Sequence, residues 1–295
     1  MPAIETQSLT RRYGNRRGIE RVTLSVPEGS LFGFLGPNGA GKTTTIRVLL
    51  GFLRPTSGAA TICGLDCWRE SAIVKKSVGY VPGDLRLYPW LSGRGALRMV
   101  GAARGTDLAR QGNALAQMFD LEMNVPVRRM SRGMRQKLGL IMALAPEPRV
   151  LILDEPTSAL DPIMQDRLRE HLRGMARRGH TVFFSSHSLG EVELLCDRIA
   201  IVREGQLVVD ATLDAIRSKA GRAVTIRWRE GAPPPLEPPP SLRLSGREGR
   251  TWIGTHDGPP EPLIAWLHGL PVEDITITPP DLETLFRQYY QPGAP

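Results

Sequence analysis

A length of 295 residues, of which 41% are hydrophobic, allows one large domain or two smaller ones with a sizeable core. No apolar stretch approaches 18 residues and the N-terminus lacks a signal-peptide pattern, so we expect a cytoplasmic chain without a membrane-spanning helix. The net charge of +8 comes from basic residues that are scattered along the chain, so we interpret them first as solvent-exposed surface and second as a surface attracted to an anionic membrane. The three cysteines match no metal-ligand spacing.

The N-terminal part of the chain is predicted to form β-strands. Residues 19–26 alternate between apolar and polar side chains and end at a turn at 27–29, so we expect antiparallel strands over residues 3–35. The last of these, at 31–35, is short and apolar. A second short strand pair is expected around residues 59–63, and a further strand at 77–82.

A glycine-rich loop follows the strand at 31–35 and fits the phosphate-loop pattern G-x-x-x-x-G-K-[ST]. We expect a helix to start at Thr44, and its N-terminus together with the loop N–H groups would attract an anion. Lys42 is predicted to reach the β- and γ-phosphates, and the Thr43 hydroxyl to hold Mg²⁺. The predicted nucleotide-binding residues are Gly36, Pro37, Asn38, Gly39, Ala40, Gly41, Lys42, Thr43 and Thr44. The alternative, a turn that binds nothing, is disfavoured because Lys and Thr are both in place.

Residues 84–148 are predicted to be mainly helical. The last helix of this segment follows Ser131, a good N-cap, and Gly133 leaves its first turn open to a phosphate. Its apolar residues recur at helical spacing, at Met134, Leu138, Ile141, Met142 and Ala145. This is a second helix end suited to phosphate, although capped helices with a nearby glycine are common.

A continuous apolar run at 150–153 ends in two acids, Asp154 and Glu155. Such a run suits a strand that is buried on both faces of a parallel sheet, and its carboxyl end lies where open α/β sheets bind ligands. Asp154 is predicted to meet Mg²⁺ through water, and Glu155 to orient or deprotonate the attacking water. A solvated strand end would be the preferred interpretation of the two acids alone, but not beside a phosphate loop.

The remaining segments predict further strands and a second domain. Strands are expected at 181–185 and 198–202, and a hairpin partner at 207–210. Beyond about residue 220 two proline triplets interrupt the pattern, and we expect strands at 223–229, 250–254 and 275–277 and helices at 262–270 and 281–290. The sequence therefore predicts domains at 1–220 and 221–295. The second has no catalytic constellation, so dimer support, regulation and passive packing all stay open.

The chain resembles the nucleotide-binding subunit of an ATP-binding cassette (ABC) transporter. Residues 131–136 resemble the family signature, residues 158–161 its D-loop, and Ser186-His187 its switch histidine, while Tyr13 resembles the aromatic that stacks on adenine. With the phosphate loop and the two acids these motifs keep the family's order over residues 3–215. The implied fold is an α/β P-loop NTPase cassette: a parallel-sheet core, an antiparallel β subdomain and a helical subdomain at about 84–148, plus a small α+β C-terminal domain.

The resemblance implies a head-to-tail dimer with ATP and Mg²⁺ as cofactors. The partner would be a second copy of the chain or a related cassette. Ser131, Gly133 and Met134 would then contact a γ-phosphate held by the partner, Asp161 would cross the interface, and catalytic His187 would contact the γ-phosphate of its own subunit. A separate transmembrane permease would hold the chain at the inner face of the membrane. The C-terminal domain resembles a branch that serves exporters of drugs, antibiotics and lipids.

Two features leave alternatives open. The residues at 11–14 could form a hairpin turn that merely exposes Tyr13, and the family's usual glutamine after the strand at 77–82 is replaced by Gly83, so Asp84 becomes a candidate metal ligand.

A soluble cassette ATPase that acts on nucleic acid or ribosomes is the alternative function, but the single set of motifs and the lack of a long coiled coil disfavour it. A GTP-binding switch is disfavoured because the chain has no Asn-Lys-x-Asp motif. We expect no specific nucleic acid partner.

Overall fold

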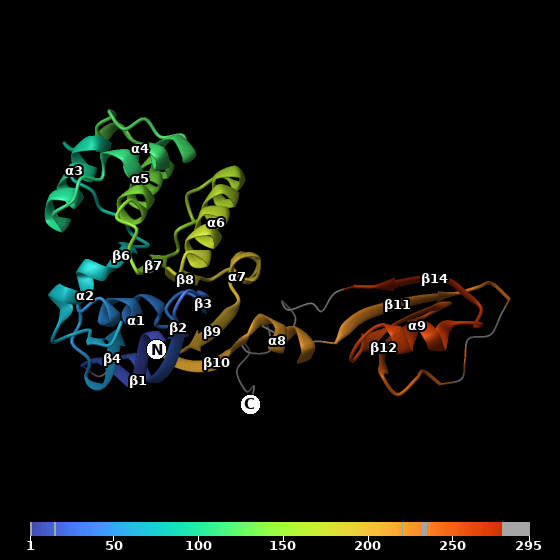
Figure 1. Ribbon diagram of the computed structural model, residues 1–295. Coiled ribbons are helices and arrows are strands. Elements are labelled where there is room, and N and C mark those ends of the chain that lie inside the picture. The colour runs from blue at the N-terminus through green and yellow to red at the C-terminus, as the bar shows by residue number, and fades with distance from the viewer. Residues whose placement is uncertain (1, 15, 220, 232–234, 236, 279–295) are drawn as a thin grey trace. The chain divides into compact units, whose positions relative to one another are not determined.

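The computed structural model describes all residues except 1, 15, 220, 232–234, 236 and 279–295 (Figure 1). The chain divides into two compact units, Met1–Ala211 and Thr212–Pro295. The helix predicted at 281–290 lies outside the described residues. No helix among the described residues is long and apolar enough to cross a membrane.

A six-stranded sheet forms the centre of the first unit (Figure 1). Its order is β10-β9-β3-β8-β7-β6, and the neighbouring pairs from β9 to β6 are parallel. The strands are β3 (Leu31–Leu35), β6 (Val78–Val81), β7 (Val150–Asp154), β8 (Thr181–Ser186), β9 (Arg198–Arg203) and β10 (Gln206–Thr212). Every residue of β3, β7 and β8 is buried, as their continuous apolar runs predict. The predicted parallel-sheet core is confirmed.

Helices cover this sheet and form a separate layer beside it (Figure 1). Helices α3 (Gly93–Arg104), α4 (Ala109–Met118) and α5 (Arg132–Leu144) occupy the segment between β6 and β7 and contact one another, with a 3-10 turn at Val127–Arg129. This is the helical subdomain. The other helices are α1 (Lys42–Leu49), α2 (Ser71–Ser77), α6 (Pro162–Arg177) and α7 (Leu189–Leu195). Helix α1 begins two residues earlier than predicted, at the lysine of the glycine loop.

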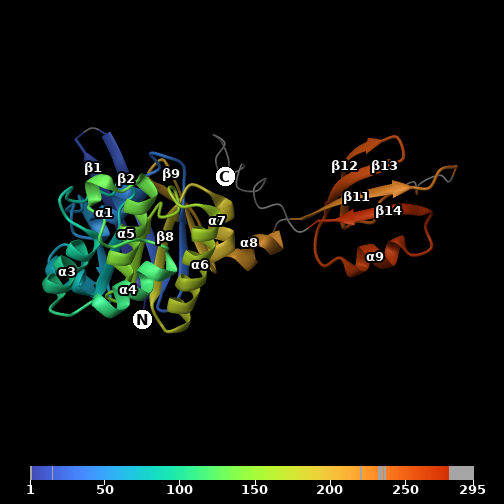
Figure 2. The same cartoon turned by 90° about the horizontal axis from the view of Figure 1, so that it is seen from above.

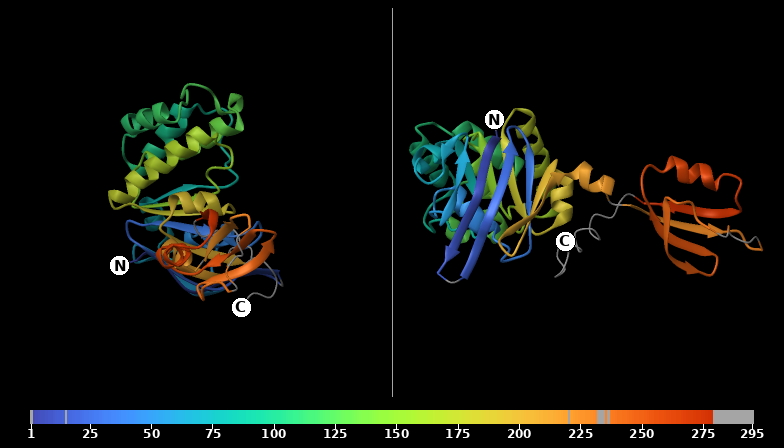
Figure 3. Two further views of the ribbon diagram at one scale, coloured as in Figure 1. Left: turned by 90° about the vertical axis from the view of Figure 1, so that its right-hand side faces the viewer. Right: turned by 90° about the horizontal axis from the view of Figure 1, so that it is seen from below.

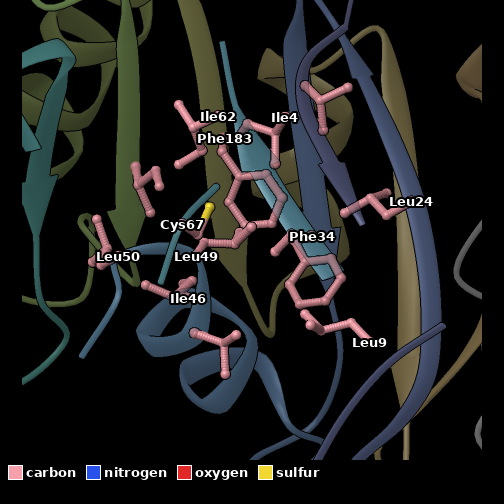
Figure 4. Close-up of a cluster of buried hydrophobic side chains, with 14 of the residues drawn as sticks. Ile4, Leu9, Leu24, Phe34, Ile46, Leu49, Leu50, Ile62, Cys67 and Phe183 are labelled. Carbon is pink, nitrogen blue, oxygen red and sulfur yellow. The ribbon is translucent and has the colours of Figure 1, made fainter. Parts of the chain in front are cut away.

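The antiparallel strands of the N-terminal region form a second sheet, ordered β2-β1-β4-β5 (Figure 2). They are β1 (Pro2–Tyr13), β2 (Arg16–Pro27), β4 (Ser57–Ile62) and β5 (Leu65–Asp66). The strand at 31–35, expected to be antiparallel with them, is instead β3 of the first sheet and pairs in parallel with β8 and β9. Ile4, Leu9 and Leu24 from this sheet meet Phe34 and Phe183 from the parallel sheet (Figure 4). Each such buried side chain contributes about 1.5–3 kcal/mol, so this core fixes α1 and the loop before it.

The second unit is a four-stranded sheet with one helix on a face (Figure 3). Its elements are α8 (Leu213–Lys219), β11 (Arg222–Trp228), β12 (Leu242–Glu248), β13 (Thr251–His256), α9 (Glu261–Leu267) and β14 (Val272–Ile277). The sheet order is β12-β13-β11-β14. Trp228 and Trp252 pack edge to face with ring centroids 5.0 Å apart, beside Leu263 of α9. The alternation that predicted β11 therefore reflects one buried face.

Candidate functional site

A pocket of about 450 Å³ opens at the carboxyl ends of the parallel strands. Its volume lies within the range of small-molecule sites. The lining comes from the glycine loop, the two acids at the carboxyl end of β7, and segments brought in from β1, β2 and α5. The residues are Tyr13, Gly18, Pro37, Asn38, Gly39, Gly41, Lys42, Thr43, Thr44, Gly83, Arg132, Asp154, Glu155, Ser158 and His187.

The glycine loop owes its shape to positions that tolerate no side chain. Gly39 and Gly41 have φ values of 82° and 108°, in the left-handed region that glycine favours. A Cβ on Gly36 would lie 2.4 Å from the Val202 carbonyl oxygen, so the loop approaches β9 closely. The Gly36 N–H donates to the Ser186 carbonyl at 3.3 Å, and the Gly205 N–H to the Ala40 carbonyl at 2.9 Å. Hydrogen bonds therefore tie the loop to the end of β8 and to the turn after β9, and its backbone packs closely against β9.

Lys42 is buried at the start of α1 and points back across the loop. It is only 5% exposed, and its Nζ donates to the carbonyls of Gly36 at 2.6 Å and Pro37 at 3.3 Å. Nζ also lies 3.2 Å from Glu155 Oε1, although this contact lacks hydrogen-bond geometry and leaves that oxygen without a hydrogen-bond partner. The ammonium and the carboxylate thus face each other inside the pocket as an ion pair.

The Asp154 carboxylate links the ends of strands β7 and β8 to the start of helix α1. Thr43 Oγ1 donates to its Oδ2 at 3.0 Å, and Ser185 Oγ donates to its Oδ1 at 2.7 Å. The side chain reaches across β8, which lies between β7 and β3 in the sheet. Mg²⁺ in phosphate sites binds oxygen donors and takes one or two protein carboxylates together with substrate phosphates. Thr43 and Asp154 fit that donor set.

Glu155 follows β7 in a strained backbone conformation. Its φ of 52° lies in the left-handed region, which costs a non-glycine residue about 1–2 kcal/mol. Its N–H donates to the Ser185 carbonyl at 3.0 Å, which ties the turn to β8. Its Oε2 lies 2.6 Å from His187 Nδ1, and the histidine side chain is 57% exposed at the rim of the pocket. The two predicted catalytic residues are in direct contact.

The four residues of the signature-like and D-loop-like segments that were predicted to bind nucleotide, Ser131, Gly133, Met134 and Asp161, do not line this pocket. Ser131 caps α5 by accepting from the Met134 N–H at 3.1 Å, and Asp161 caps α6 by accepting from the Met164 N–H at 3.0 Å. A Cβ on Gly133 would lie 2.9 Å from the Ala159 carbonyl, so the start of α5 packs against the turn before α6. Two other residues of these segments, Arg132 and Ser158, do line the pocket.

Tyr13 and Gly83 line the pocket, but Asp84 does not. The Arg11 guanidinium lies 5.1 Å from the Tyr13 ring centroid, so one ring face carries a cation. The structure does not support Asp84 as a metal ligand. Its exposed carboxylate accepts hydrogen bonds from Arg86 Nε at 3.0 Å and Nη2 at 2.9 Å, so it is paired with an arginine two residues away and lies outside the pocket.

Several residues of the site were missed in the sequence. Gly18 and Ser158 line the pocket, and Ser185 holds Asp154. Arg132 stands inside the signature-like segment, and its place in the pattern was the only signal available. The cysteines are no part of the site, since Cys67 and Cys196 are buried and burial raises the pKa of the Cys67 thiol to about 12.

Comparisons with known proteins agree with this geometry. The family model described as ABC transporter matches residues 19–158. The chain is 39% identical over 208 residues to an uncharacterized ABC transporter ATP-binding protein, YhcH, of Bacillus subtilis, covering 70% of this chain and 68% of that protein. It is 36% identical over 222 residues to the bacitracin transport ATP-binding protein BcrA of Bacillus licheniformis, covering 73% of this chain and 72% of that protein. A solved ATP-binding subunit of an ABC transporter superposes with a TM-score of 0.70 at 30% identity, over 74% of this chain and 92% of that chain.

Proposed function

Because the chain belongs to the ABC transporter family, we propose that it is the subunit that binds and hydrolyses ATP to power an exporter. One observation carries this proposal above the others. The buried Lys42 ammonium and the Glu155 carboxylate lie 3.2 Å apart at the mouth of a phosphate loop, beside the Thr43–Asp154 hydrogen bond. Phosphate binding, metal binding and water activation each have a residue in this one pocket.

The proposed chemistry is the hydrolysis of ATP to ADP and phosphate. The loop N–H groups and Lys42 hold the β- and γ-phosphates, and Tyr13 stacks on the base. Thr43 and Asp154 would hold Mg²⁺, which supplies positive charge at the phosphate oxygens. Glu155 orients a water and accepts its proton while the water oxygen bonds to the γ-phosphorus and the bond to the bridging oxygen breaks. His187 donates a hydrogen bond to the γ-phosphate.

The Lys42–Glu155 contact suggests how binding prepares the base. Glu155 Oε1 faces the lysine and has no hydrogen-bond partner in the structure. Phosphates that take up the lysine would release this oxygen, which can then accept a hydrogen bond from water. The base therefore becomes available when the substrate arrives.

The surface at the start of α5 supports a proposed head-to-tail dimer. Ser131, Gly133, Met134 and Asp161 do not line their own subunit's pocket. The first turn of α5 has no acidic residue, so its positive end is suited to a phosphate held by another subunit. We propose that the other subunit of this dimer is a second copy of the chain or a related cassette. A separate transmembrane permease would hold the dimer at the inner face of the membrane.

Export is proposed from the relatives rather than from a transport residue. BcrA is named for bacitracin transport, and this chain covers 72% of its length. This supports a transporter over a soluble ATPase that acts on nucleic acid or ribosomes. We further propose that residues 1–220 carry the ATPase and that residues 221–295 support or regulate the dimer.

Loss of the buried lysine tests the function. We expect Lys42→Ala to abolish hydrolysis and to weaken Mg²⁺–ATP binding strongly, because a charge-assisted contact to phosphate is lost. Lys76→Ala is the control, since Lys76 is exposed and lies outside the pocket. Isothermal titration and phosphate release measure the two quantities. A Lys42→Ala variant that binds and hydrolyses ATP as the wild type does would refute the proposal.

A further inference from the structure

One carboxylate outside the pocket joins two segments that are distant in sequence. Glu191 stands in the first turn of α7 and accepts two hydrogen bonds of 2.7 Å. Thr157 Oγ1 donates to its Oε1, and Ser186 Oγ donates to its Oε2. Thr157 is 5% exposed and Ser186 is fully buried. Short O–H···O⁻ bonds at buried hydroxyls belong to the strong class of hydrogen bonds.

The two donors flank the proposed catalytic pair. Thr157 comes two residues after Glu155, and Ser186 comes directly before His187. The ladder between β7 and β8 ends at the pair Asp154 and Ser185. Past that pair, the described contacts between the two segments are the Glu155 N–H bond to the Ser185 carbonyl and the Glu155–His187 side-chain contact. Glu191 therefore bridges the two turns just where the sheet stops holding them together.

Thr157 and Ser186 also make hydrogen bonds that connect them to neighbouring parts of the site. The Thr157 carbonyl accepts from the Leu160 N–H at 3.0 Å, which closes the turn that leads to Asp161, the cap of α6. On the other side, the Ser186 carbonyl accepts from the Gly36 N–H, and the Ser188 N–H donates to Ser186 Oγ at 2.9 Å. A continuous chain of contacts thus runs from the phosphate loop through Glu191 to the turn at 157–161.

We propose that Glu191 is a positioning residue that fixes the Glu155–His187 contact and couples the phosphate pocket to the turn at 157–161. The inference rests on the proposed ATPase function. A carboxylate suits the role because both partners donate, whereas Gln offers one acceptor oxygen and one donor group. Asp is one methylene shorter, so from the same position on α7 it cannot keep both contacts.

Kinetics provide the first part of the test. Glu191→Ala is expected to lower kcat by up to about 100-fold through misplacement of the catalytic pair. KM for ATP should stay close to the wild-type value, because Lys42 and the loop do not contact Glu191. Adding Thr157→Val to Glu191→Ala should have little further effect, since both changes break the same contact. Glu170→Gln, an exposed glutamate of α6, is the control. If Glu191→Ala does not fold, Thr157→Val and Ser186→Ala each remove one donor and serve in its place.

Amide hydrogen exchange separates this inference from the proposed function, because it needs no hydrolysis. In the wild type, Mg²⁺–ATP should slow exchange at 156–161 and 186–190 together. In Glu191→Ala only 186–190 should respond. A variant with normal kcat, or with equal responses in both segments, overturns the positioning role and leaves the ATPase intact. A wild type with the coupled response but no hydrolysis overturns the ATPase and keeps Glu191 as the link.

Discussion

Replacing Glu155 with Gln removes one charge from the pocket at nearly constant volume. At 3.2 Å the attraction between Lys42 and Glu155 is about 5 kcal/mol for an effective dielectric constant of about 20. Most of this is offset, because the lysine keeps two carbonyl acceptors and the Glu155 side chain is 20% exposed. We therefore expect the nucleotide-free variant to be less stable than the wild type by about 1–3 kcal/mol.

Nucleotide should reverse this loss while hydrolysis fails. The neutral side chain removes a negative charge beside the phosphates, so ATP should bind more tightly. Loss of the general base should lower kcat by roughly 10²–10⁴-fold, or about 3–5 kcal/mol of barrier. At an ATP concentration of about 100 times Kd, binding adds about 2.7 kcal/mol of stability. The ATP-bound variant should then be about as stable as the nucleotide-free wild type.

Denaturant unfolding with and without Mg²⁺–ATP, phosphate release and light scattering measure these outcomes, with the exposed Glu122→Gln as control. A Glu155→Gln variant that hydrolyses ATP at the wild-type rate refutes the assignment of the base. Unchanged stability without nucleotide refutes the ion-pair argument. A shift from monomer to dimer only with ATP supports the head-to-tail dimer. A persistent monomer with bound ATP means that closure needs the permease or that the roles of Ser131 and Asp161 are wrong.

Three further predictions concern other parts of the first unit. Gly36→Ala should lower the free energy of unfolding by about 1–3 kcal/mol, because the new Cβ would lie 2.4 Å from the Val202 carbonyl oxygen. Gly190→Ala on α7 is the control: its Cβ would meet no atom within 4 Å, so this variant should be more stable than the wild type by about 0.4–1 kcal/mol. Chemical unfolding measures both values. Arg132→Gln should weaken ATP binding by removing a cation from the pocket wall, and Arg129→Gln, outside the pocket, should not; titration calorimetry compares them. Burial and Arg178 lower the pKa of His171 below 6.5, so the unfolded chain binds more protons there and stability should fall as the pH drops through and below 6.5. His171→Gln should flatten that acid limb in melting experiments, and an unchanged slope would contradict the assignment.

The parts of the fold that follow from local pattern were predictable. The glycine loop and the acids of β7 were predictable because each stands next to a continuous apolar strand in the sequence, so strand and functional residues can be recognised together. Helix α6 was not predicted, although Asp161 as N-cap and Pro162 in the first turn form a recognisable helix start. Strand β12 was missed because its seven residues include arginine, serine and glycine with little apolar alternation. Its place follows from pairing with β13.

The parts of the site that depend on tertiary contacts were not predictable. Asp84 was chosen because it follows Gly83 in sequence, yet Arg86 competes for its carboxylate two residues away. Glu191 gave no sequence signal beyond lying four residues after His187. Its hydroxyl partners come from other segments, and only the packing of α7 against β8 brings them within reach.

The left-handed backbone at Glu155 has a consequence for engineering. A glycine at this position would relieve about 1 kcal/mol of backbone strain, but it would also remove the carboxylate that faces the buried Lys42 ammonium, a loss of about 1–3 kcal/mol by the reasoning for Glu155→Gln. In a library selected for thermal tolerance alone, glycine should therefore stay uncommon at position 155 even though it suits the backbone. Selection that also demands turnover should exclude glycine, and the difference in its frequency between the two regimes would report how much catalysis adds to the ion pair in keeping an acid at this strained position.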